Sequence, residues 1–262
     1  MSAAKIRALT QKIRAGDMRA LAEAISIFED SHPLKTRLLK NLMARNRRGA
    51  RGFSIGVTGS AGSGKSTLIA ALTKAIRKDK KKVAVIAVDP TSPKSGGAFL
   101  GDRVRMQDLA DDPGVFIRSM ASRGAQGGVA RATQDAVWLC LTAGYDFVFV
   151  ETVGAGQLDY KITEIADLTL LVLTPEAGDE MQFMKAGLRE LVDAFVINKA
   201  DRPGAQTMED FLKRIQVGEK LQKPVFKTVA EQSKEINPLY QFILRLSQKG
   251  VGARFPRLKG AG

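Results

Sequence analysis

Short apolar runs alternate with longer amphipathic segments over most of the chain after residue 50. The apolar runs cover residues 53–58, 83–88, 147–150, 168–173 and 195–197, and Phe226 marks one more short strand. Such runs are typical of buried strands, and the segments between them are long enough for crossover helices. The pattern predicts an α/β fold with a mostly parallel, twisted sheet and helices on both faces.

The two ends of the chain differ from this alternation. Residues 3–48 carry apolar positions at helical spacing, such as Leu9 and Ile13, and residues 237–249 predict a closing helix before a glycine-rich, basic tail. We therefore predict an N-terminal helical extension over residues 1–50 and a central α/β domain over 51–232. Residues 233–262 form the expected C-terminal helix and tail.

A glycine-rich loop stands between the first expected strand and an expected helix over residues 65–77. Glycines let backbone N–H groups approach phosphate oxygens, and a helix N-terminus favours negative charge. Eight positions and both flanks match the P-loop pattern, which argues against a chance glycine-rich turn. The sequence therefore predicts a P-loop nucleoside triphosphatase, in which Lys65 reaches the β- and γ-phosphates and Ser66 binds Mg²⁺. The candidate phosphate-binding residues are Gly59, Ala61, Gly62, Ser63, Gly64, Lys65, Ser66 and Thr67.

Acidic residues follow two further expected strands. Glu151 comes directly after residues 147–150, and Asp89 directly after residues 83–88. Each alone would also fit an ordinary strand end or turn, but downstream of a P-loop both are candidate Mg²⁺ ligands. Gly154 offers an N–H group to the γ-phosphate. Glycine-rich residues 96–103 predict a switch loop, and residues 122–128 predict a second loop or a plain connector.

The segment Asn198-Lys199-Ala200-Asp201 follows the expected strand over residues 195–197. A carboxylate at Asp201 can accept hydrogen bonds from guanine N1–H and N2–H₂, whereas adenine would leave it unpaired at a cost of about a few kcal/mol. Lys199 would pack its aliphatic stem along the base. The tetrapeptide alone is weak evidence, but its position after a strand and downstream of a P-loop favours GTP over ATP.

The composition limits which partners and metal sites are expected. The net charge of +14 either attracts polyanions or simply aids solubility. Aromatic residues make up only 6% of the chain, and the clusters of basic residues contain none, so we do not expect a nucleic-acid partner. One cysteine, Cys140, and one histidine, His32, cannot form a disulfide framework or a Cys/His metal centre. Without an apolar leader or a membrane-length apolar run, we expect a cytoplasmic protein with no membrane partner.

Taken together, the chain resembles the MeaB/ArgK family of GTPases over roughly residues 50–230, about one domain. The resemblance rests on the motifs above and on residues 87–92, 100–106, 117–128, 151–157 and 178–182. It implies that Ser66, Asp89, Asp102 and Glu151 surround Mg²⁺ and that Val229 and Ala230 lie in a loop over the guanine. It also implies a homodimeric accessory protein that gates cofactor loading into an adenosylcobalamin-dependent acyl-CoA mutase, or protects that mutase.

The expected reaction is hydrolysis of GTP to GDP and phosphate by in-line attack of water, with Lys65, Glu151 and Gln157 as candidate catalytic residues. In many small GTPases a glutamine directly follows the γ-phosphate-sensing glycine, but here Ala155 does and Gln157 lies further on. We therefore expect slow turnover that a partner accelerates, with Arg103, Arg105 and Arg123 as candidate arginine fingers. Two alternatives are a metallochaperone-type GTPase, which would require a Cys/His cluster, and a GTP-dependent docking module without hydrolysis.

Overall fold

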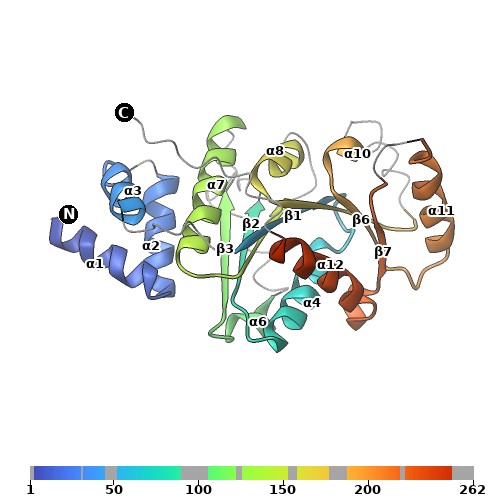
Figure 1. The fold of residues 1–262 in the computed structure, drawn as a ribbon, viewed down its shortest axis with the longest axis horizontal. Coiled ribbons are helices and arrows are strands. Elements are labelled where there is room, and N and C mark those ends of the chain that lie inside the picture. Colours follow the sequence, from blue (N-terminus) through green and yellow to red (C-terminus); the bar gives the residue numbers. More distant parts are fainter. Residues whose placement is uncertain are drawn as a thin grey trace, which may run out of the picture.

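A seven-stranded sheet forms the centre of the molecule (Figure 1). The computed structural model describes residues 3–30, 32–44, 52–89, 106–121, 126–152, 158–176, 188–218 and 222–249. The strand order is β3-β2-β4-β1-β5-β6-β7, and every neighbouring pair is parallel. The strands are β1 (Phe53–Gly59), β2 (Val83–Asp89), β3 (Val115–Ala121), β4 (Phe147–Thr152), β5 (Leu168–Leu173), β6 (Ala194–Asn198) and β7 (Val225–Thr228). The carboxyl ends of all strands therefore lie at one edge of the sheet.

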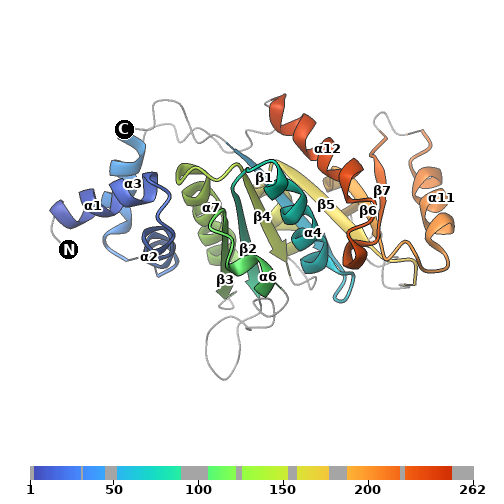
Figure 2. The ribbon, with the colours of Figure 1, turned by 90° about the horizontal axis from the view of Figure 1, so that it is seen from below.

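Helices cover both faces of this sheet, as the sequence predicts (Figures 1 and 2). One face packs against α4 (Lys65–Lys78), α6 (Gln107–Ala110) and α12 (Ile236–Gln248). The other packs against α7 (Gln126–Thr142), α8 (Leu158–Ile165) and α11 (Ala205–Ile215), with α10 (Leu188–Leu191) beside α8. Because both faces are covered, β1, β4, β5 and β6 are buried along their whole length.

The described residues of the N-terminal extension form three helices, α1 (Ala3–Arg14), α2 (Met18–Glu29) and α3 (Lys35–Ala44), beside β3 and α7. The buried side chains of these helices share one apolar cluster with α7. Two polar contacts strengthen the attachment: Arg118 of β3 donates to Glu29 at 2.6 Å, and Lys35 pairs with Asp135 of α7 at 2.5 Å. The extension is therefore joined to the edge of the sheet by packing and by ion pairs.

Two features at this side of the sheet differ from the sequence predictions. Strand β3 was not expected, because the polar residues Arg118 and Ser119 interrupt its apolar pattern. Helix α7 begins at Gln126 and includes Gly127 and Gly128, which the sequence assigned to a loop or connector. The apolar face of α7 is buried farther along the helix, and this burial outweighs the roughly 1 kcal/mol that each glycine costs in a helix.

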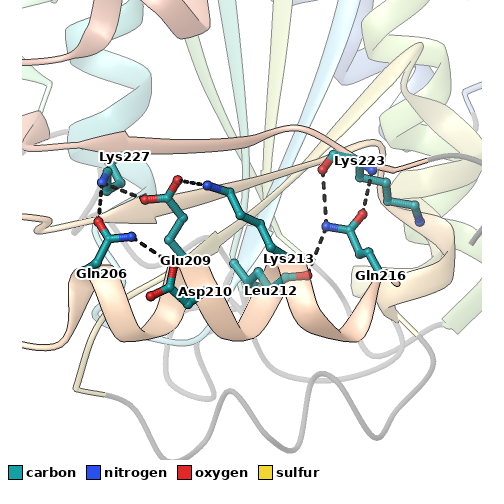
Figure 3. A network of polar contacts seen from close by, with 8 residues as sticks. All are labelled: Gln206, Glu209, Asp210, Leu212, Lys213, Gln216, Lys223 and Lys227. Atoms are coloured by element: carbon teal, nitrogen blue, oxygen red, sulfur yellow. Dashed lines mark hydrogen bonds and ion pairs between the residues drawn. The ribbon is translucent and has the colours of Figure 1, made fainter. Parts of the chain in front are cut away.

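A polar network fastens α11 to β7 at the opposite edge of the sheet (Figure 3). The Glu209 carboxylate accepts from Lys213 at 2.6 Å and from Lys227 of β7 at 2.6 Å. The side chain of Gln216 bonds to the backbone of Lys223 just before β7. Hydrogen bonds from Lys213 and then Lys227 hold the pKa of Glu209 below its ordinary value. An edge strand with one neighbouring strand gains support from these contacts.

We predict that Glu209→Gln lowers the melting temperature at pH 7 by roughly 1–3 °C, because Lys213 and Lys227 lose the ionised carboxylate with which both pair. The pKa of Glu209 is lowered on folding, so its contribution is present above the unfolded pKa and is lost as the pH falls through the folded pKa. The difference from wild type should therefore shrink on acidification below about pH 4. Thermal unfolding across pH measures this, with the exposed Glu23→Gln as control. If the melting temperature of Glu209→Gln were lowered by the same amount at about pH 3 and at about pH 7, the ionised carboxylate would not be the cause of the stabilisation.

Candidate nucleotide-binding site

The P-loop joins the carboxyl end of β1 to the first residue of α4, at the centre of the sheet. Gly59, Gly62 and Gly64 have φ angles of 145°, 79° and 86°. A Cβ atom at Gly59 would lie 2.2 Å from the carbonyl oxygen of Val172, and one at Gly64 would lie 2.3 Å from Asn198 Nδ2. Gly62 faces open space, so only its backbone conformation favours glycine. The loop therefore needs glycines both for its shape and for close approach to β5 and β6.

Lys65 bends back over the loop. Its Nζ donates to the carbonyl oxygens of Gly59 and Ser60, both at 2.9 Å, and only 6% of the residue is exposed. The ammonium group thus lies beside the N-terminus of α4, whose first N–H groups also favour anions. Together they concentrate positive potential at the carboxyl edge of the sheet.

Ser66 and Glu151 meet next to this loop. The Ser66 hydroxyl donates to Glu151 Oε1 at 2.6 Å, and both residues are 5% exposed. Glu151 stands opposite Ala87 in the β2–β4 register, and Asp89 ends β2 two residues farther toward the same edge. Within the described ranges no group of three or more His, Cys, Asp or Glu residues could hold a metal. A buried hydroxyl and carboxylate are nevertheless the hard oxygen ligands that suit Mg²⁺.

Asn198 connects the P-loop to the segment over residues 228–230. Its Nδ2 donates to the carbonyl oxygen of Ser63 at 2.9 Å, and its Oδ1 accepts from the backbone N–H of Ala230 and the hydroxyl of Thr228, both at 3.2 Å. Lys199 donates to the carbonyl oxygen of Gly62 at 2.8 Å. These bonds bring residues 59–65, 198–199 and 228–230 into one site.

The proposed guanine loop is short and internally bonded. Val229 and Lys234 exchange backbone hydrogen bonds of 3.1 and 3.2 Å around the short 3₁₀ helix η1 (Ala230–Gln232). Asp201 is exposed and lies two residues after Lys199, whose φ of 56° turns the chain away from β6. A carboxylate at this position is accessible to a base that lies over Lys199.

Several residues that the sequence singles out lie outside the described residues: Asp102, Arg103, Arg105, Arg123, Gly154, Ala155, Gln157 and the segment 178–182. Conversely, the structure adds Thr228, which directly precedes the expected loop residues Val229 and Ala230 and donates to Asn198. Cys140 is fully buried, and burial raises the pKa of its thiol, so this residue packs in the apolar core and lies outside the site. No helix in the described part of the chain is long and apolar enough to cross a membrane.

Comparisons with known proteins identify the family of this chain. The sequence profile of the family described as "Methylmalonyl Co-A mutase-associated GTPase MeaB" matches residues 21–253. A putative GTPase of Pyrococcus abyssi is 43% identical over 242 residues, which cover 90% of this chain and 74% of that protein. The Caenorhabditis elegans protein named "Methylmalonic aciduria type A homolog, mitochondrial" is 40% identical over 208 residues, 75% of this chain and 52% of that protein.

Among solved structures, one titled "Crystal structure of LAO/AO transport system kinase" superposes with a TM-score of 0.74 and 28% identity. The superposition covers 97% of this chain and 79% of that chain. The P-loop fold, the family profile and the sequence identity agree with one another. The chain therefore belongs to the MeaB family of methylmalonyl-CoA mutase-associated GTPases, and it is a GTPase that binds guanine nucleotides.

Proposed function

We propose that the chain is an Mg²⁺-dependent GTPase that serves an adenosylcobalamin-dependent acyl-CoA mutase, either by gating cofactor loading or by protecting the mutase. The observation that carries the proposal is the set of bonds from Asn198 and Lys199 to the P-loop, because these bonds hold the expected phosphate-binding loop beside the segment that we propose reads the guanine. The mutase as client is supported by the description of the family and by the name of the C. elegans relative.

Lys65 would bind the β- and γ-phosphates. Its ammonium group now donates to two carbonyl oxygens of its own loop, so it can exchange these neutral acceptors for charged phosphate oxygens. With phosphate both partners carry a full charge, which adds a Coulombic attraction that the neutral carbonyl oxygens do not provide. The N–H groups of residues 62–67 and the N-terminus of α4 would supply the remaining donors.

Ser66 and Glu151 would hold Mg²⁺, with Asp89 and Asp102 as further ligands. When bound, the ion neutralises charge on the β- and γ-phosphate oxygens during hydrolysis. The short bond between Ser66 and Glu151 keeps both oxygen donors together beside the P-loop. Gly154 would sense the γ-phosphate through its N–H group, and Gln157 is the candidate that orients water. We propose slow turnover by the isolated chain, because the sequence offers no glutamine directly after Gly154.

The proposed client relationship predicts that an adenosylcobalamin-dependent methylmalonyl-CoA mutase from the same source stimulates GTP turnover at least tenfold, by completing a site that is slow alone. Phosphate release at saturating GTP, with and without the mutase, measures this. Lys65→Ala is the control and should show neither basal nor stimulated turnover. Equal turnover with and without the mutase would contradict the accessory function while leaving the GTPase assignment intact.

If Asp201 reads the guanine, Asp201→Asn should weaken GTP binding at least tenfold and improve binding of xanthosine triphosphate. The amide N–H₂ that this substitution introduces would face the guanine N2 amino group, which is also a donor, whereas xanthine has a carbonyl oxygen at that position and can accept from the amide. Competition against a fluorescent GDP analogue gives both affinities. Asp111→Asn, at another exposed aspartate, should leave both unchanged. An unaltered preference in Asp201→Asn would overturn the base-reading role.

The P-loop glycines give a matched pair of variants. Gly64→Ala and Gly62→Ala both place a side chain at positive φ, but only the Cβ at Gly64 would collide with Asn198, at 2.3 Å. We expect Gly64→Ala to weaken GDP binding at least tenfold more than Gly62→Ala, because it also displaces the Asn198 side chain from Ser63. Isothermal titration with GDP measures the difference, and equal losses would show that backbone strain alone matters.

A further inference from the structure

Four lysines occupy the turn between α4 and β2, at the amino-terminal edge of the sheet. They are Lys78 at the end of α4 and Lys80, Lys81 and Lys82 before β2. In the part of the chain that the structure describes, none of the four forms an ion pair. This group, the basal lysine cluster, therefore presents four cations that form no ion pair within the described residues.

The acidic groups around the cluster already have partners. Asp79 accepts a 2.5 Å hydrogen bond from Tyr240 of α12, Asp112 accepts two bonds of 2.9 Å from Arg77, and Asp146 accepts from the backbone N–H of Lys82 at 2.7 Å. The Arg77 bonds hold the pKa of Asp112 below its ordinary value. These carboxylates fix the backbone of the turn and its neighbours, and the lysine side chains remain for other contacts.

The backbone at Lys80 is itself unusual. This residue has a φ of 57°, and its N–H donates to Arg77 O at the carboxyl end of α4. Glycine is the residue that best fits a left-handed position after a helix. A lysine there, among three others, adds conformational strain and like-charge repulsion. Local rules that a sequence breaks in this way often mark a functional surface.

The cluster lies away from the nucleotide site but is connected to it by one helix. Lys65 begins α4 and Lys78 ends it, so the two ends are about 20 Å apart. A partner bound at the cluster would leave the P-loop open to nucleotide. The N-terminal extension adjoins the same surface, because a Cβ atom at Gly16 would lie 3.2 Å from Lys82 Nζ.

We propose that the basal lysine cluster is a docking surface for an acidic face of a protein partner. Lysines carry compact charges on flexible stems, which suit an irregular array of carboxylates. The interspersed Asp79, Asp112 and Asp146 would repel a uniformly anionic phosphate backbone but can fit a protein surface of mixed charge. The four lysines stand in sequence without an aromatic residue, so no stacking platform accompanies them.

The test compares two quadruple variants that lose the same charge. One neutralises the cluster (Lys78→Ala, Lys80→Gly, Lys81→Ala, Lys82→Ala), and the other neutralises four exposed cations elsewhere (Arg7→Ala, Arg37→Ala, Lys40→Ala, Arg214→Ala). The probe is a poly-glutamate peptide of about 20 residues at about 0.1 M salt, chosen so that charges beyond about 10 Å are screened. Fluorescence anisotropy gives the dissociation constants, and titration with GDP verifies that each variant retains its nucleotide site.

We expect the cluster variant to bind poly-glutamate at least tenfold more weakly than wild type and the control variant to stay within twofold. Lys80→Gly alone should weaken binding while raising the melting temperature, which separates lost contact from lost folding. Equal losses in the two quadruple variants would overturn the proposal, since net charge would then explain binding. A cluster dependence seen only with a 20-nucleotide single strand, or only with phosphatidylserine vesicles, would overturn it as well. Because no mutase is used, the result is separate from the client relationship proposed above.

Discussion

The site depends on the side chain of Asn198, which holds together three segments that are distant in sequence. Its amide nitrogen donates to Ser63 in the P-loop, and its amide oxygen accepts from Thr228 and Ala230 near the carboxyl end of β7. A carboxylate could keep the acceptor role but not the donor role, and an aliphatic side chain could keep neither. Because Asn198 is only 2% exposed, each lost bond would leave a buried polar group without its partner, at a cost of about 1–3 kcal/mol. Asn198 therefore supports both the P-loop and the segment over residues 228–230, which the proposed function places around one nucleotide.

The parallel sheet explains why these segments meet at all. β1 lies at its centre between β4 and β5, and the chain reaches β2 and β3 on one side and β5 to β7 on the other. In open α/β sheets, ligands bind at the carboxyl ends of strands where the chain reverses direction across the sheet. The P-loop follows β1 at that position, Glu151 lies in β4 on one side, and Asn198 ends β6 on the other. Each candidate group comes from a different strand, and burial of both sheet faces fixes its position.

The sequence predicts much of this arrangement because buried parallel strands and P-loops have local signatures. The expected strand over residues 168–173 coincides with β5, and the expected strand over 53–58 ends one residue before β1 does. The sequence does not predict strand β3, because the polar Arg118 fits a buried strand only through its ion pair with Glu29 of the N-terminal extension. The hydrogen bond from Lys199 to Gly62 could not be predicted either, because 137 positions separate the two residues and no local pattern encodes their contact. Local sequence patterns predict most helices and strands, whereas the contacts between strands and loops across the sheet appear only in the structure.

The length of the Glu151 side chain matches the distance that it spans. The carboxylate reaches the hydroxyl of Ser66 at 2.6 Å. An aspartate on the same backbone would be shorter by one carbon–carbon bond of about 1.5 Å. The gap to Ser66 would then approach 4 Å, beyond the range of a hydrogen bond. The backbone of β4 is fixed by parallel pairing with β1 and β2 on both sides, so it cannot move to close such a gap. A glutamate is thus the acidic residue whose side-chain length fits the distance that strand pairing fixes between β4 and Ser66 at the start of α4.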